Sequence, residues 1–256
     1  SDYYLPSSAC LIQERLGLKQ TIGAIDVNQG CSGFVYSLGL AKGLIETNQA
    51  KNILVITADT YSKYINEKDK SVKTLFGDAA ACTLIKAIDE SDGEFVSNPV
   101  YGTNGKGAQH LIVPDGGARN PISDTSYIET KDDSNNIRNQ ANIFMNGKQI
   151  FTFTLSAVPN VFKEILEKES ITIDDIDVVI FHQANKFILD SLQKKLKIPE
   201  EKMHRSYQEF GNTVSSTIPI GLKKEIVKNK NKRGSRTALL LGFGVGLSWA
   251  GNIVKY

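Results

Sequence analysis

Short apolar runs constrain the fold of this chain more than any other feature. Residues 52–58 (NILVITA) form one such run, and residues 79–85, 178–181 and 237–241 form three more. Runs of this length and composition are typical of strands that are buried on both faces of a sheet. They alternate with segments whose apolar residues recur at helical spacing. This alternation predicts an α/β protein with a largely parallel sheet.

The order of the expected elements occurs twice: a strand, a helix that begins beside a polar residue, and two further strands. The first copy surrounds Cys31 and the second surrounds Asn212. We therefore predict two related α/β halves, residues 1–91 and residues 92–256. The expected strands are residues 21–27, 52–58, 79–85, 178–181, 237–241 and 247–254, and the expected helices are residues 32–45, 142–158, 187–196 and 213–227.

A polar, turn-rich segment interrupts the second half. Residues 115–140, here called the polar insert, contain Asp-Gly-Gly at 115–117 and Asp-Asp-Ser-Asn-Asn at 132–136. These residue types favour turns and surface positions. We expect the polar insert to be a surface excursion rather than part of the core.

The composition argues against several function classes. Hydrophobic residues make up 41% and charged residues 23% of the 256 residues, as in an ordinary globular protein. Thirty Lys and Arg against 28 Asp and Glu leave a net charge of +2, too small to attract nucleic acid or an anionic membrane over the whole surface. No apolar run reaches the ~18 residues that a membrane-spanning helix needs.

The three cysteines, Cys10, Cys31 and Cys82, are too few and too scattered for a disulfide framework. No Cys-x-x-Cys pair suggests a metal site, and we expect no metal. A cytoplasmic protein fits this cysteine usage best. The glycines at 242–246 follow an expected strand, but no dinucleotide-binding half follows them, so a Rossmann site is not expected.

Cys31 is the first candidate for chemistry. It stands between an expected strand and an expected helix, with Gly30 and Gly33 on either side. The positive end of a helix dipole favours a thiolate, and so a nucleophile. The alternative is a small, buried structural cysteine. Cys10 and Cys82 lie inside apolar patterns, and we expect both to be buried and unreactive.

His182 and Asn212 also stand at the ends of expected elements. His182 follows the strand at 178–181, where open α/β sheets place their ligand sites, although a lone histidine is often structural. Asn212 precedes an expected helix, and its alternative role is that of a helix N-cap. One cysteine, one histidine and one asparagine at element ends outline a nucleophilic acyl-transfer site.

Five motifs, in this order, resemble those of the β-ketoacyl-acyl-carrier-protein synthase III family. The pair His-Gln-Ala-Asn and Gly-Asn-Thr is specific to this branch of the thiolase fold. The resemblance implies two pseudo-repeated halves in an α-β-α-β-α layered arrangement, with the N-terminal half truncated. The motifs are residues 26–34 (DVNQGCSGF), 75–80 (LFGDAA), 182–185 (HQAN), 211–213 (GNT) and 242–249 (GFGVGLSW).

The resemblance also implies an activity, the decarboxylative Claisen condensation that initiates fatty-acid-type synthesis. Cys31 would take the acyl group from acyl-CoA, and His182 and Asn212 would assist decarboxylation of malonyl-acyl-carrier protein. The backbone N–H groups of Cys31 and Val245 would form the oxyanion hole. The family usually has glycine at the position of Val245, so the pocket is expected to differ there. No cofactor is implied, because the CoA thioester is itself the substrate.

Further residues acquire expected roles from the same resemblance. Lys70 and Lys186 stand where the family has Arg, and would contact CoA or the acidic carrier protein. Leu5 would reach into the acyl pocket of a partner subunit in a homodimer. Family members begin earlier, and the residue that stacks on the CoA adenine has no counterpart here. We therefore expect this shortened chain to be weakly active or inactive.

Two other functions stay open at this point. One is an acyltransferase of the same family that passes the acyl group from Cys31 to an amine or hydroxyl acceptor, in polysaccharide or secondary metabolism. The polar insert and Val245 are compatible with that function. The other is a non-catalytic partner subunit of the thiolase fold, which would be expected to lack the cysteine. Only the condensation releases CO₂ from a malonyl thioester.

Overall fold

The computed structural model describes residues 2–89, 91, 93–232 and 234–256. Ser1 lies outside the described residues, and so does Asp92, where the second expected half begins. The division into halves at this position therefore stays a prediction. Within the described ranges, no helix is both long enough and apolar enough to cross a membrane.

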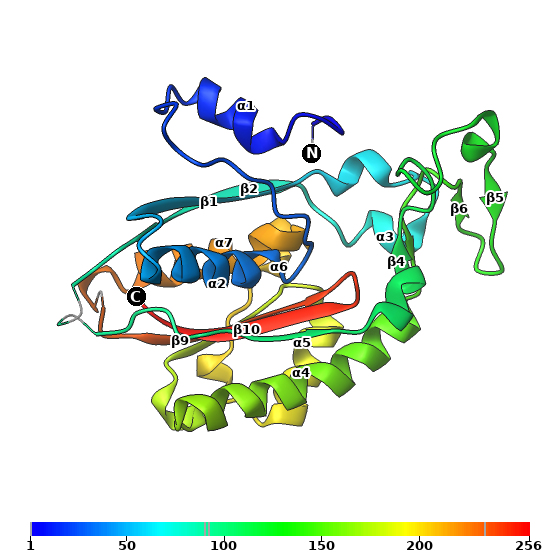
Figure 1. The fold of residues 1–256 in the computed structure, drawn as a ribbon. Helices are drawn as coiled ribbons and strands as arrows, with labels where there is room; N and C mark the ends of the chain where they lie inside the picture. The colour runs from blue at the N-terminus through cyan, green and yellow to red at the C-terminus, as the bar shows by residue number, and fades with distance from the viewer. Residues whose placement is uncertain (1, 90, 92, 233) are drawn as a thin grey trace.

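Helices and sheets alternate in five layers (Figure 1). Helix α1 lies on the outer side of the β1–β2 sheet, α2 and α7 lie between the two larger sheets, and α4 and α5 cover the far face of the four-stranded sheet. The expected α-β-α-β-α arrangement is confirmed. The α-helices are α1 (Ser8–Arg15), α2 (Gly33–Glu46), α3 (Lys70–Lys73), α4 (Gly147–Glu169), α5 (Lys186–Leu196), α6 (Tyr207–Phe210) and α7 (Thr217–Lys228).

Among the described residues, the strands lie in one four-stranded and three two-stranded sheets. They are β1 (Asn52–Asp59), β2 (Ala79–Lys86), β3 (Val100–Thr103), β4 (Leu111–Ile112), β5 (Thr130–Lys131), β6 (Ile137–Arg138), β7 (Phe144–Met145), β8 (Val178–Phe181), β9 (Thr237–Gly244) and β10 (Ser248–Lys255). Short 3-10 helices join them: η1 (Tyr61–Tyr64), η3 (Gly105–His110), η4 (Asp124–Tyr127), η5 (Ile173–Asp175), η6 (Glu200–Lys202), η7 (Val214–Ser216) and η8 (Lys230–Lys232).

The expectation of a largely parallel sheet is wrong. The four-stranded sheet has the order β3-β10-β9-β8, and only β8 and β9 run parallel. A parallel pair needs a long crossover connection, and the chain supplies one between β8 and β9. Strands β9 and β10 are joined by a three-residue turn, so they pair antiparallel. Strands β1 and β2 also pair antiparallel.

The strand expected at residues 21–27 is also wrong. No strand is assigned there, and Ile25 and Val27 are exposed to 69% and 39%. A strand needs a hydrogen-bonded neighbour, and among the described residues β1 pairs with β2 alone. Strand β1 is buried on one face only, not on both as expected, because Leu54 and Ile56 on its other face stay exposed.

The C-terminal sheet is buried on both faces, as expected. All residues of β8 are buried, and so are those of β9 after Thr237. Alternate residues of β9 enter different cores: Leu239 and Leu241 pack with α4 and α5, and Ala238 and Leu240 pack with α2 and α7. This period of two follows from strand geometry. The two cores fix the end of β9, and the cavity described below lies at that end.

Helix α4 begins later than the sequence predicts. It starts at Gly147 rather than near residue 142, because the side chain of Asn146 accepts the N–H of Gln149 at 3.1 Å and caps the helix there. Strand β7 occupies the residues just before it. Helix α5 and strand β8 match their expected bounds to within one residue.

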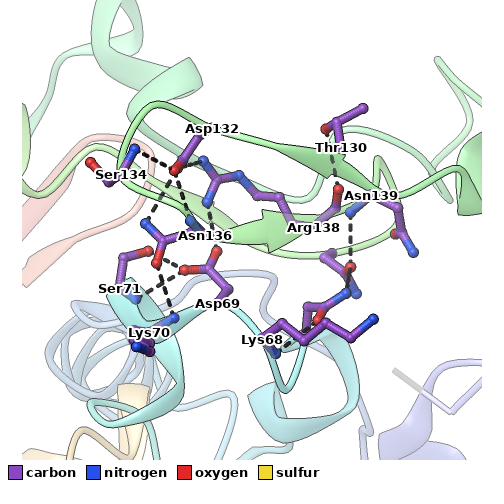
Figure 2. A network of polar contacts seen from close by, with 12 residues as sticks. Lys68, Asp69, Lys70, Ser71, Thr130, Asp132, Ser134, Asn136, Arg138 and Asn139 are labelled. Atoms are coloured by element: carbon purple, nitrogen blue, oxygen red, sulfur yellow. Dashed lines mark hydrogen bonds and ion pairs between the residues drawn. The ribbon is translucent and has the colours of Figure 1, made fainter.

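The polar insert is a surface excursion, as expected, but it is firmly anchored. Its β5–β6 hairpin lies at one end of the molecule (Figure 1). Figure 2 shows how Arg138 joins it to α3: the guanidinium contacts the fully buried carboxylate of Asp69 at 2.6 Å and also contacts Asp132. The side chain of Asn136 accepts the backbone N–H of Lys70 at 3.1 Å. These contacts hold the start of α3 against the hairpin.

Candidate active site

Cys31 lies in the turn before α2 and is 3% exposed. The end of β9 runs directly against its side chain. A Cβ on Gly244 would lie 2.6 Å from the Cys31 sulfur, so a residue larger than glycine would displace the thiol. Glycine at position 244 is therefore required for the Cys31 thiol to lie where it does.

The thiol of Cys31 is protonated in the free protein at neutral pH. Burial raises its pKa to about 12, and the nearby Asp59 carboxylate acts in the same direction. The N–H of Val245 donates to the sulfur and offsets part of this increase. The expectation that the helix end holds Cys31 as a thiolate is wrong, because burial raises the pKa of the thiol more than the backbone N–H groups of Val245 and Cys31 lower it.

The other two cysteines are exposed, contrary to the expectation that they are buried. Cys10 lies on α1, a helix with no buried residue. Cys82 lies on β2, where every second residue is exposed. Apolar patterns in both segments suggested burial, but neither segment has a packing partner on that side among the described residues.

His182 follows β8 and is 2% exposed. Its backbone N–H donates to the carbonyl of Leu241 at 2.9 Å, which fixes it beside the end of β9. Its Nδ1 lies 2.8 Å from the hydroxyl oxygen of Thr217. Burial lowers the pKa of His182 to about 3, and the Val214 carbonyl only partly offsets this. The ring is therefore neutral at physiological pH, and Nε2 is the nitrogen left for a group in the cavity.

Asn212 is held by the backbone of a distant segment. Its N–H donates to the carbonyl of Leu75 at 2.8 Å, and its own carbonyl accepts the N–H of Gly77 at 3.0 Å. Its side-chain Oδ1 accepts the N–H of Val214 at 3.0 Å. Asn212 is thus not the N-cap of α7, which begins at Thr217. With Oδ1 engaged, the amide Nδ2 is the group that can donate to a ligand.

Cys31, His182 and Asn212 line one cavity of about 30 Å³. They come from three separate segments of the chain, and the remaining walls are mainly apolar. The other lining residues are Leu75, Phe76, Leu111, Met145, Ile150, Ala184, Asn185, Ile188, Phe243 and Gly244. Across the described residues, no group of three or more His, Cys, Asp or Glu side chains could hold a metal ion. The cavity thus brings a thiol, a neutral imidazole and a primary amide together among mainly apolar side chains.

Val245 lies behind the thiol rather than in the cavity. Its Cγ1 lies 2.3 Å from the place where a Cβ on Gly30 would be, so the two positions fit together only because residue 30 is glycine. Its carbonyl accepts the hydroxyl of Ser248 at 2.9 Å. The side chain that distinguishes Val245 from glycine therefore packs against Gly30, and Val245 is not among the residues that line the cavity.

Three other residues with expected roles lie outside the cavity lining. Lys186 is the first residue of α5, directly after Asn185, and its exposed side chain pairs with Asp190. Lys70 is exposed at the start of α3. Leu5 is 87% exposed. Their positions leave all three free to meet another molecule.

Thr217 and Val214 contact the site residues, and the motifs did not single them out. Both belong to the run Thr-Val-Ser-Ser-Thr at 213–217, which is buried throughout. A signal was present in the sequence, since four hydroxyl side chains within five residues precede an apolar helix. Side chains of this kind are buried where they have partners to bind.

Comparisons with known proteins show the family of this chain. The family model 3-Oxoacyl-[acyl-carrier-protein (ACP)] synthase III matches residues 25–105, and the model of its C-terminal part matches residues 166–256. Beta-ketoacyl-[acyl-carrier-protein] synthase III of Caldanaerobacter subterraneus subsp. tengcongensis is 35% identical over 255 residues, which cover 100% of this chain and 73% of that protein. The Clostridium perfringens enzyme of the same name is 37% identical over 254 residues, 99% of this chain and 74% of that one.

Solved structures give the same result. A crystal structure of a 3-oxoacyl-(acyl-carrier-protein) synthase III superposes with a TM-score of 0.95 at 47% identity, over 100% of this chain and 75% of that one. The corresponding synthase of Thermus thermophilus gives a TM-score of 0.83 at 30% identity, over 100% and 74%. Sequence, fold and site agree, and the chain belongs to the 3-oxoacyl-[acyl-carrier-protein] synthase III family, with the thiolase-like fold of that family.

Proposed function

We propose that this chain catalyses the decarboxylative condensation of an acyl-CoA primer with malonyl-acyl-carrier protein, the reaction that initiates fatty-acid synthesis. The observation that carries the proposal is the single cavity shared by Cys31, His182 and Asn212. Membership of the synthase III family supports the same reaction. The names of the relatives do not support an acyltransferase acting on amines or hydroxyls.

The first half-reaction transfers the acyl group to Cys31. The sulfur attacks the thioester carbonyl, the S–H bond breaks, and the CoA thiolate leaves and takes up a proton. The N–H of Val245 already donates to the sulfur, and with the N–H of Cys31 it would stabilise the oxyanion. Because the pKa of the thiol is about 12, the attack requires a base, and neutral His182 lies in the same cavity.

The second half-reaction forms the carbon–carbon bond. The malonyl carboxylate leaves as CO₂, and its electrons pass into the thioester as an enolate. Nδ2 of Asn212 and Nε2–H of His182 would donate to the enolate oxygen. The enolate carbon attacks the acyl-cysteine carbonyl, the C–S bond breaks, and the Cys31 thiolate takes up a proton from water. The product is a 3-oxoacyl-carrier protein, and no cofactor takes part.

Three exposed residues, Lys186, Lys70 and Leu5, have proposed roles in binding other molecules. Lys186 stands beside Asn185 at the cavity, and Lys70 lies on α3, so both are available to an acidic carrier protein or to CoA. Leu5 is exposed and available to the acyl pocket of a second subunit in a homodimer. We assign the protein to the cytoplasm, where acyl-CoA is found.

The deciding experiment supplies acetyl-CoA and malonyl-acyl-carrier protein and measures both products. We expect CO₂ release together with 3-oxoacyl-carrier protein, and an acetyl group on the peptide that contains Cys31. The variant Cys31→Ala is the control and should form no condensation product. Transfer of the acetyl group to an amine or hydroxyl acceptor without CO₂ would overturn the proposal in favour of the acyltransferase.

A further inference from the structure

The hydroxyl of Thr217 faces two acceptors. Its oxygen lies 2.8 Å from Nδ1 of His182 and 3.0 Å from the carbonyl oxygen of Val214. Thr217 is 2% exposed and His182 is 2% exposed, so this contact is shielded from bulk solvent. A hydroxyl has one proton, and it can donate to only one of these two groups at a time.

Val214 connects both polar side chains of the site. Its N–H donates to Oδ1 of Asn212, and its carbonyl faces Thr217 and His182. Its φ is 53°, a left-handed conformation that a β-branched residue rarely adopts. Strain of this kind persists where the surrounding structure holds the backbone in place, often at functional sites. The turn at Val214 therefore orients His182 and Asn212 together.

The direction of the Thr217 hydroxyl decides which nitrogen of a neutral His182 carries the proton. If Thr217 donates to the Val214 carbonyl, Nδ1 must be the donor, and Nε2 is a bare acceptor. If Thr217 donates to Nδ1, the proton is on Nε2. The Val214 carbonyl then still accepts the backbone N–H of Thr217, so it does not become an unpaired buried acceptor.

We propose that Thr217 is a positioning residue that sets the tautomer of His182, donating to Nδ1 so that Nε2–H can donate to the thioester oxygen during decarboxylation. The proposal rests on the proposed function, because that reaction needs a donor at Nε2. Acylation of Cys31 needs a base instead, and the opposite hydroxyl direction supplies it. A hydroxyl that can turn between two acceptors lets one neutral histidine serve both steps.

Kinetics of two steps test the proposal. Thr217→Val keeps the shape and removes the hydroxyl, so Nδ1–H would donate to Val214 and Nε2 would lose its proton. We expect decarboxylation of malonyl-CoA to fall about 10²-fold, as for one lost oxyanion donor, with a much smaller fall in acylation of Cys31. Thr217→Ser should restore most of the decarboxylation. The control Thr154→Val removes another fully buried hydroxyl, which contacts the Ile150 carbonyl, and should keep the wild-type ratio of the two rates.

Nitrogen NMR of the histidine rings gives a second readout that does not need turnover. In the Cys31→Ala background with saturating acetoacetyl-CoA, we expect the proton of His182 on Nε2 with Thr217 present and on Nδ1 with Thr217→Val. An unchanged tautomer, equal losses in both steps, or no rescue by Thr217→Ser would overturn the proposal. If the wild type does not decarboxylate malonyl-CoA, the proposed function fails, and the tautomer measurement decides the role of Thr217 by itself.

Discussion

The hydroxyl oxygens of Ser32 and Ser248 lie 2.7 Å apart, and both side chains are buried. Ser32 directly follows Cys31, and Ser248 begins β10. Ser248 also contacts the carbonyl of Val245, whose N–H donates to the Cys31 sulfur. This pair of hydroxyls therefore links the turn that holds the thiol to the turn whose N–H donates to it.

Removing this link should slow acylation of Cys31. In Ser248→Ala the hydroxyl of Ser32 loses a buried partner, and we expect the free energy of unfolding to fall by about 1–3 kcal/mol. The turn at Val245 would also lose its hydrogen bond from the Ser248 hydroxyl. The rate of acyl transfer from acetyl-CoA should therefore fall about tenfold or more, which is part of the loss expected when one oxyanion donor is removed. Stopped-flow acylation and urea unfolding measure the two effects. Ser191→Ala, at a half-buried helical position outside the cavity lining, is the control and should leave acylation unchanged.

Cysteine labelling should follow exposure rather than position at a helix end. Cys10 and Cys82 are exposed, whereas Cys31 is buried with a raised pKa. Iodoacetamide at neutral pH should therefore modify Cys10 and Cys82 first, because the thiolate is the reactive form. Peptide mass spectrometry over time gives the order, and in urea all three should react at similar rates. Faster labelling of Cys31 in the folded protein would show that the site holds a thiolate.

How much of the fold the sequence predicts depends on whether each element finds its partners within the same stretch of chain. Helix α5 was predicted to within one residue because its apolar period and its cap, Asn185, are local signals. The strand expected at residues 21–27 was wrong because pairing is a property of neighbours, which composition does not specify. The parallel sheet was wrong for a similar reason: the short turn between β9 and β10 decides their direction, not their burial.

The candidate site could be predicted in its residue types but not in its electrostatics. Motifs identified Cys31, His182 and Asn212, and the structure brings all three to one cavity, while their catalytic roles stay predictions. The pKa of Cys31 could not be predicted, because it depends on burial by elements far apart in the sequence. The same holds for Thr217, whose contact with His182 spans 35 positions of the chain.

His182 should make stability depend on pH with a definite sign. Burial lowers its pKa from 6.5 to about 3, so below pH 6.5 the unfolded chain binds a proton that the folded protein does not. The free energy of unfolding should fall as the pH falls from 6.5 toward 3, by up to ~1.4 kcal/mol per pH unit. From pH 7.5 to pH 5, His182 alone should lower the free energy of unfolding by about 2 kcal/mol.

The variant His182→Gln should remove this contribution. Urea unfolding at pH 7.5 and pH 5 gives the difference in the free energy of unfolding between wild type and variant. This difference should be smaller at pH 5. His110→Gln is the matched control, since His110 is only partly buried, and its difference from the wild type should change less. A difference for His182→Gln that is the same at both pH values would contradict a buried neutral imidazole.

The two polar side chains of the site should matter for decarboxylation more than for acylation. In His182→Ala or Asn212→Ala the enolate loses one side-chain donor, and release of CO₂ from malonyl thioester should fall about 10²-fold or more. Acyl-Cys31 should still form in both variants, because the backbone N–H of Val245 is unchanged, but it should form more slowly in His182→Ala, which also removes the base, than in Asn212→Ala. CO₂ release and intact-protein mass measure the two steps separately. Decarboxylation at the wild-type rate in either variant would remove that residue from the mechanism.

Lys186 offers the sharpest test of carrier-protein binding. Its ammonium group is exposed at the start of α5, next to the cavity residue Asn185, and pairs with Asp190 on its own helix. Reversal of its charge in Lys186→Glu should weaken the use of malonyl-acyl-carrier protein more than the use of malonyl-CoA, because an acidic protein presents many charges to the same surface. The loss should appear mainly in kcat/KM and shrink as salt is added, since exposed charges are screened.

Lys194→Glu supplies the matched control for this charge reversal. Lys194 lies in the last turn of the same helix and is also exposed, so the variant has the same net charge but changes the far end of α5. We expect Lys194→Glu to keep the wild-type preference between the two malonyl donors at every salt concentration. Equal losses in the two variants, or a loss in Lys186→Glu that salt does not change, would mean that Lys186 belongs to an ordinary solvated surface and that the carrier protein binds elsewhere.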